Sequence, residues 1–201
     1  RTTDPASKSQ IALPIKVFQD VVQNEGQSDD PLEQAIADFV VIAFYFLLRV
    51  GKYICPSGSK RTRTVQFWRC DVTFWKMLPG GIHHQISPLA TLNEFISADS
   101  VTLTLSTEER GKGATLNHEA VPGPFCPVKT LARRYVASRQ TQPDNEYALL
   151  CSYAPQKVLT AKHIDQILQR AAFWTTIWME GFASIGLAPI PSAPRAQCNY
   201  T

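Results

Sequence analysis

The chain has 201 residues, of which 44% are hydrophobic and 18% are charged, and this is enough for one sizeable domain with a buried core. Twenty Lys and Arg residues nearly balance 17 Asp and Glu residues, so the net charge of +3 permits binding to nucleic acid without arguing for it. Five scattered cysteines without a Cys-x-x-Cys pair predict free thiols in an intracellular protein and argue against a zinc site.

The N-terminal part of the chain predicts a linker followed by a helix. Residues 1–10 are polar, and residues 11–24 carry apolar side chains at helical spacing. The sequence contains no secretory signal, so we expect a protein that is not secreted. Because the chain opens at Arg1 and not at a methionine, we expect a fragment of a longer protein.

A second helix is the most clearly marked element of the sequence. Asp30 is a favourable N-cap and Pro31 suits the first helical position. Ten uncharged and mostly apolar residues follow from Phe39 to Leu48, which predicts a helix covered by neighbours on most sides and too short to cross a membrane. This run ends at Arg49. An arginine at the end of a buried helix costs free energy unless an anion meets it, so Arg49 is a candidate functional residue.

The rest of the chain alternates short strands and helices. A basic loop, a strand and a turn are predicted first, then a two-stranded hairpin and two further helices, which together indicate a mainly helical α+β domain. The predicted ranges are 51–63 for the loop, 64–74 for the strand, 75–81 for the turn, 98–106 and 114–120 for the hairpin, and 128–139 and 159–172 for the helices.

The adjacent pair His83 and His84 raises the possibility of a metal site. Neighbouring residues on a strand point to opposite sides of the sheet, so two adjacent histidines do not converge on one ion. We therefore expect solvated or hydrogen-bonded histidines and no metal.

The order of several segments resembles that of the catalytic domain of tyrosine recombinases, which are phage-integrase-like proteins. The resemblance is closest to the eukaryotic branch associated with mobile elements, and it covers most of residues 11–172. It implies an integrase-like catalytic core with a small three-stranded antiparallel sheet. The segments that carry it are Ala43–Tyr53, Arg61–Phe67, Asp71–Phe74, Val101–Leu105, Phe125–Val128 and Leu131–Arg134.

The resemblance assigns catalytic roles to two residues. Arg49 corresponds to the first catalytic arginine, which grips the scissile phosphate and stabilises the charge that builds on its oxygens. Lys112 is the one lysine between the hairpin strands and corresponds to the general acid for the leaving oxygen, although Glu108 aligns better with that position. Lys52 stands where the family has a glutamate, which weakens the expected orientation of Arg49.

The same resemblance makes double-stranded DNA the expected partner. The candidate phosphate contacts are Lys60, Arg61, Arg63, Lys112, Arg133 and Arg134. Two alternatives stay open, namely a solvated basic face and a helical protein without a DNA role, whose basic residues would be spread around the surface. The family also implies a nuclear location in a eukaryote, assembly of copies on DNA, and no cofactor.

The second half of the family's catalytic site is missing from this chain. No His-x-x-Arg motif follows Ala172, since His163 is followed three residues later by Gln166, and Tyr200 lacks the family's preceding motif. Back-translation of residues 189–200 in a shifted frame allows His-Ser-Leu-Arg, which resembles the missing motif. We therefore expect residues 173–201 to be an out-of-frame or disordered tail, and the protein to be inactive in DNA strand cleavage and rejoining.

Overall fold

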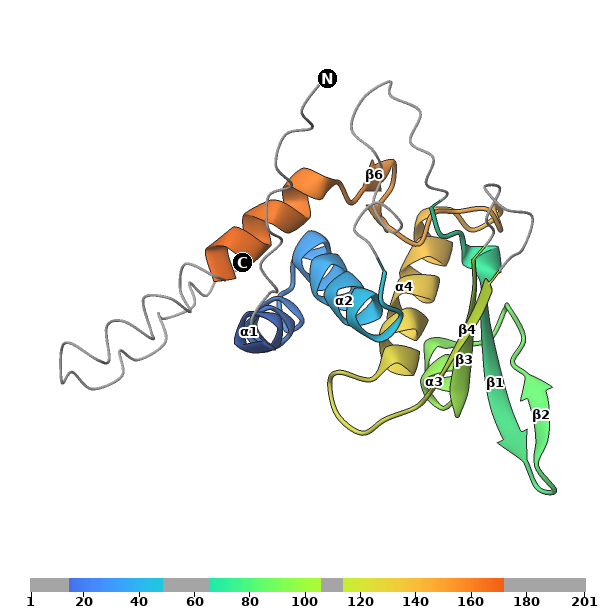
Figure 1. Cartoon of the computed structure of the whole chain (residues 1–201). Helices are drawn as coiled ribbons and strands as arrows, with labels where there is room; N and C mark the ends of the chain where they lie inside the picture. Colours follow the sequence, from blue (N-terminus) through green and yellow to red (C-terminus); the bar gives the residue numbers. More distant parts are fainter. Residues whose placement is uncertain (1–14, 49–65, 106–113, 172–201) are drawn as a thin grey trace, which may run out of the picture.

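The computed structural model describes residues 15–48, 66–105 and 114–171. They form an α+β arrangement in which helices gather on one side of an antiparallel sheet (Figure 1). The predicted fold class is confirmed at this level. The predicted linker 1–10 and tail 173–201 lie outside the described residues.

Five α-helices are found in the described residues, together with one short 3-10 helix. Those over the predicted ranges are confirmed with small shifts in their ends, whereas α3 was not predicted although Thr91 and Glu94 form a capping box at its start. The helices are α1 (Ile15–Glu25), α2 (Pro31–Tyr45), the 3-10 helix (Arg69–Asp71), α3 (Leu92–Ile96), α4 (Pro127–Thr141) and a last helix over residues 161–171.

The main sheet has four antiparallel strands in the order β2-β1-β3-β4, and a separate two-stranded sheet follows α4. The predicted hairpin is confirmed as β3 and β4, which pair from Ser100 opposite Glu119 to Leu105 opposite Ala114. The strands are β1 (Val72–Leu78), β2 (Ile82–Gln85), β3 (Ser100–Leu105), β4 (Ala114–Glu119), β5 (Ser152–Ala154) and β6 (Lys157–Val158).

The prediction of a three-stranded sheet was wrong, because the first strand is displaced along the chain. It begins at Val72 and runs to Leu78, through residues that were predicted to turn. The turn comes later, where Gly80 and Gly81 both have positive φ angles of 89° and 76°. Glycine adopts this conformation without steric cost, so β2 can pair with β1 and add a fourth strand.

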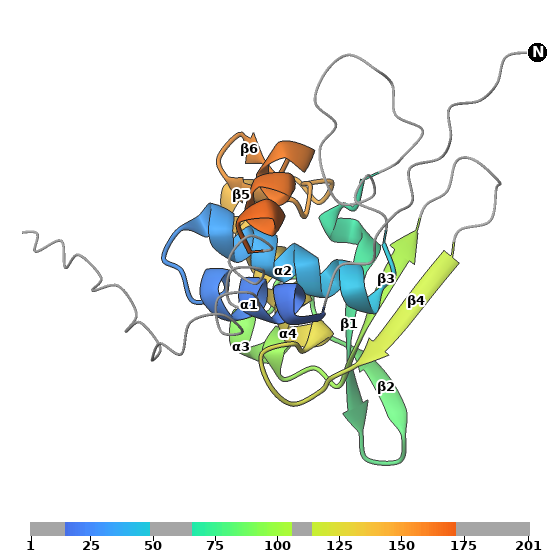
Figure 2. The ribbon, with the colours of Figure 1, turned by 60° about the vertical axis from the view of Figure 1, so that its left-hand side comes forward.

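The core lies between α2, α4 and the inner face of the sheet (Figure 2). Eight consecutive residues of α2, from 35 to 42, are buried. The burial predicted for the apolar run 39–48 is confirmed only in its first half, because Phe44 and Leu47 are 51% and 89% exposed. Phe74 of β1, Phe95 of α3 and Tyr135 of α4 pack their rings together, with centroids 4.7–5.7 Å apart. Within the described residues, no helix is both long and apolar enough to cross a membrane.

Candidate nucleic-acid interface

The C-terminal end of α2 determines where the chain enters the segment that carries Arg49. The helix ends at Tyr45, and the Phe46 N–H donates to the carbonyl of Ile42 at 2.9 Å. Leu47 then adopts a left-handed conformation with φ of 50°, and the Leu48 N–H donates back to Ala43 at 3.0 Å. This closing turn is a Schellman-type end with leucine at the position that glycine usually occupies. The prediction that the helix reaches Leu48 is therefore wrong.

The same end of α2 packs on β4. The rings of Tyr45 and Phe46 contact the imidazole of His118 edge-on, with centroids 5.6 Å and 4.5 Å apart. His118 belongs to the strand that follows residues 106–113. The end of α2, which leads to Arg49, therefore packs against the β3–β4 hairpin, whose connecting segment contains Lys112.

Five of the seven predicted site residues are not placed by these observations. Arg49, Lys60, Arg61 and Arg63 fall in 49–65, and Lys112 falls in 106–113, and both segments lie outside the described residues. Glu108 and Lys52 lie outside them as well. The roles that the resemblance assigns to these residues stay predictions.

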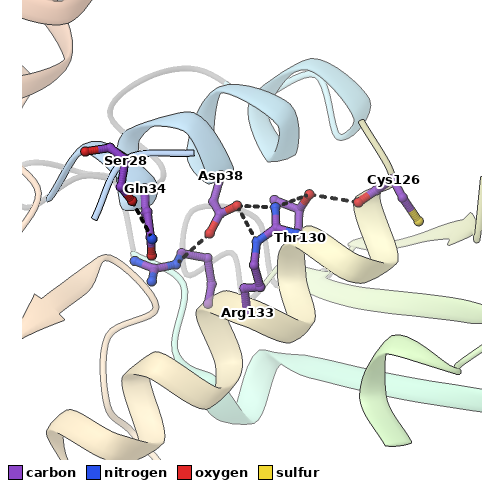
Figure 3. A network of polar contacts seen from close by, with 7 residues as sticks. Ser28, Gln34, Asp38, Cys126, Thr130 and Arg133 are labelled. Carbon is purple, nitrogen blue, oxygen red and sulfur yellow. Dashed lines mark hydrogen bonds and ion pairs between the residues drawn. The ribbon is translucent and has the colours of Figure 1, made fainter. Parts of the chain in front are cut away.

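Arg133 and Arg134, the other two predicted site residues, both form ion pairs with Asp38. Figure 3 shows Asp38 and Arg133 pointing toward each other. Arg133 donates through Nε to Asp38 Oδ1 at 3.0 Å, and its side chain is 43% exposed. Arg134 lies 3.2 Å from Asp38 Oδ2 through its Nε, and its side chain is 5% exposed. Arg133 can therefore reach a ligand in solvent, whereas Arg134 is occupied inside the protein.

The α4 backbone helps to position Arg133. The Thr130 hydroxyl donates to the carbonyl of Cys126 at 2.8 Å, and Arg133 Nη2 donates to the same hydroxyl at 3.3 Å (Figure 3). Arg133 is thus held by Thr130, one helical turn before it, and by Asp38 on α2. This arrangement links α2 to α4 through polar contacts in addition to their apolar packing.

The cluster of Asp38, Arg133 and Arg134 carries one more positive than negative charge. Burial raises the pKa of the Asp38 carboxyl, and the two guanidinium groups oppose that rise. Burial also lowers the pKa of Arg134, and Asp38 opposes that change. Arg134 Nε is close to Asp38 but is poorly aligned for a hydrogen bond, and within the described residues Arg134 Nη1 has no hydrogen-bond partner. The Coulomb attraction to Asp38 is therefore the main compensation for burying Arg134.

Asp38, the partner of this arginine pair, was not predicted from the sequence. The available signal was an acidic residue just before the uncharged run of α2, a position that is buried if the rest of that face is buried. A buried carboxylate requires a partner, and a pair of adjacent arginines on another helix is the kind of partner to look for.

Other arginines bind backbone carbonyls and so stabilise loops. Arg69 is 7% exposed and donates to the carbonyls of Gln142 and Pro143, just beyond α4. Arg139 donates to the carbonyl of Pro88 at 3.0 Å. These contacts favour structural roles for both side chains.

The positive charge of the chain is concentrated outside the described residues. The described stretches contain ten Lys and Arg residues against 13 Asp and Glu residues. Segment 49–65 alone contains five basic residues and no acidic one. Within the sequence, the positive charge is therefore most concentrated in this segment.

The two adjacent histidines lie on β2 at the edge of the sheet, where all four residues of the strand are exposed. Across the described part of the chain, no three His, Cys, Asp or Glu side chains gather closely enough to hold a metal ion.

Cys70, Cys126 and Cys151 form no disulfide, whereas Cys55 and Cys198 lie outside the described residues.

Comparisons with family models, curated proteins and solved structures found no match.

Proposed function

We propose that this chain is a domain of the tyrosine-recombinase kind that holds double-stranded DNA through its phosphates and does not cleave it. The observation that carries the proposal is the charge pattern, in which segment 49–65, with five basic and no acidic residues, begins four residues after the end of the largely buried helix α2. A cationic segment anchored to a rigid element is suited to phosphate binding, because ordering it costs less than ordering a free chain.

The second support is the position of the described residues on either side of the predicted catalytic residues, at the end of α2 and the start of β4. Arg49 lies one residue beyond Leu48, and Lys112 lies two residues before Ala114 of β4. Because α2 ends against β4, the scaffold is compatible with an arginine and a lysine that act on one phosphate. The integrase-like core that the resemblance implies is part of this proposal.

The missing chemistry argues against cleavage. Covalent strand transfer by this family requires a His-x-x-Arg motif and a tyrosine nucleophile. The sequence has no His-x-x-Arg motif after Ala172, and its one tyrosine there, Tyr200, lacks the family's preceding motif. An arginine without a nucleophile can still bind the phosphate, which leaves DNA binding as the remaining activity. Copies that assemble on one DNA molecule and a nuclear location belong to the same proposal.

A DNA-binding titration with a paired control variant tests this proposal. Lys60→Ala/Arg61→Ala/Arg63→Ala is compared with Lys157→Ala/Lys162→Ala, since the latter lysines are exposed on β6 and the last helix. If all three residues neutralise phosphates, the first variant should lower the slope of log K against log salt by about 2.7. The control should leave the slope nearly unchanged. Equal effects of the two variants, or binding that does not respond to salt, would contradict phosphate binding by this segment.

Cleavage is tested separately with a suicide DNA substrate that traps a covalent protein–DNA adduct. We expect no adduct from this chain. An adduct that resists denaturation would show that a nucleophile is present and would overturn the inactive part of the proposal.

A further inference from the structure

The outer face of the four-stranded sheet has a chemistry that differs from that of a phosphate-binding surface. Phe74 and Val101 point to the core, so their neighbours along each strand point away from it. None of the described strand residues on this outer face is Lys or Arg, and Glu119 is its one charged residue. The face does carry an indole, that of Trp75, at the centre of the sheet.

A chain of hydrogen bonds holds that indole in place. Trp75 Nε1 donates to Thr102 Oγ1 at 2.8 Å, and the Thr102 hydroxyl donates to Asn117 Oδ1 at 2.6 Å. Thr102 lies on the neighbouring strand and pairs with Thr73, two residues before Trp75. The bond therefore draws the indole across the sheet toward Thr102, and Trp75 stays partly exposed on this face.

The same chain of hydrogen bonds determines which atom of the Asn117 side-chain amide faces Thr102. An indole N–H can only donate, so Thr102 Oγ1 accepts from Trp75 and uses its single proton toward Asn117. That proton requires the amide oxygen of Asn117 to face Thr102. The amide nitrogen of Asn117, an exposed residue, therefore points away with two N–H donors.

These groups border a shallow hollow of about 570 Å³ on the outer face of the sheet, which is also lined by Ser100, His83 and Glu119. The hollow thus offers a flat aromatic surface, oriented N–H donors and a carboxylate acceptor. A nucleobase presents a planar ring with both donors and acceptors on its edge, and base stacking on aromatic side chains tolerates any sequence. A phosphate does not suit the hollow, since Glu119 would repel it.

We propose that this outer face binds an unpaired nucleobase of single-stranded DNA, with Trp75 as the stacking surface and Asn117 as a hydrogen-bond donor. The inference rests on the proposed DNA binding and adds a preference for DNA with unpaired bases. In the sequence, the basic segment 49–65 ends seven residues before β1 begins at Val72.

Fluorescence anisotropy with two labelled duplexes tests the inference, one fully paired and one with a central bubble of unpaired bases. The wild-type protein should bind the bubble at least about fivefold more tightly. Trp75→Ala should abolish this preference and leave affinity for the paired duplex unchanged. Trp68→Ala is the matched control, since Trp68 is exposed but packs against Tyr147 away from the sheet face.

Two further variants keep the test decisive if Trp75→Ala does not fold. Trp75→Phe retains a stacking ring without the indole N–H and should retain part of the preference, while Asn117→Ala should reduce it. The inference is overturned if the wild type shows no preference or if Trp75→Ala retains it. If the wild-type protein binds the bubble through Trp75 but does not bind the paired duplex, this inference stands and the proposed phosphate contacts are refuted.

Discussion

Replacing Asp38 by Asn should destabilise the protein strongly, because it leaves a buried arginine without a counter-charge. Asp38 is 3% exposed, and Arg134 is 4% exposed with its Nε 3.2 Å from the carboxylate. Removing one partner of a buried ion pair costs about 3–5 kcal/mol in free energy of unfolding. With a urea m-value of about 2–3 kcal/mol/M, the midpoint of unfolding should fall by about 1–2.5 M.

The assay is urea unfolding followed by circular dichroism, with Asp20→Asn as the control. Asp20 pairs with Lys16 at 2.7 Å on the surface of α1, and exposed helical pairs of this kind contribute only about 0.3–0.5 kcal/mol. The double variant Asp38→Leu/Arg134→Met removes both buried charges and should recover most of the lost stability. A loss of less than about 1 kcal/mol for Asp38→Asn would refute the reasoning that Arg134 depends on this carboxylate.

Two further predictions concern the helix ends. Leu47→Gly should raise the free energy of unfolding by up to about 1 kcal/mol. The reason is that Leu47 has a φ of 50°, which glycine adopts without strain, and is 89% exposed, so little packing is lost. Thermal unfolding should show a higher Tm, and a lower Tm would contradict this prediction. Hydrogen bonds from Thr91 hold the pKa of Glu94 below its ordinary value of 4.5, so the stability that this cap adds is present above that pH and is lost as the pH falls through the lowered pKa. Glu94→Ala should therefore be less stable than the wild type at pH 6, with the difference shrinking at acidic pH, and a constant difference would contradict this sign.

Several elements could be predicted from local sequence because their signals are local. Asp30 and Pro31 mark the start of α2, which the structure confirms. The uncharged run 39–48 predicts burial, which holds for residues 39–42 but not for the exposed residues near its end. The β3–β4 hairpin is also predictable, since Val101 and Leu103 alternate with polar residues. The end of α2 was misjudged, because an apolar run gives no indication of a leucine that turns left-handed.

The candidate site could be predicted only in part. The basic segment and the Arg133–Arg134 pair can be found in the sequence, but the sequence does not show that Arg134 is buried and Arg133 half-exposed. Adjacent helical residues point about 100° apart, so the packing of α4 against α2 decides which of the two arginines meets solvent.

By itself, the sequence determined the α+β class, the buried character of α2 and the concentration of positive charge in residues 49–65. These properties depend on the order and type of neighbouring residues. The tertiary structure alone decided that the sheet has four strands, that Asp38 meets the two arginines of α4, and that Trp75, Thr102 and Asn117 form one chain on three strands. Asp38 and Arg133 are 95 residues apart, and no local pattern encodes a contact between residues so far apart in the chain.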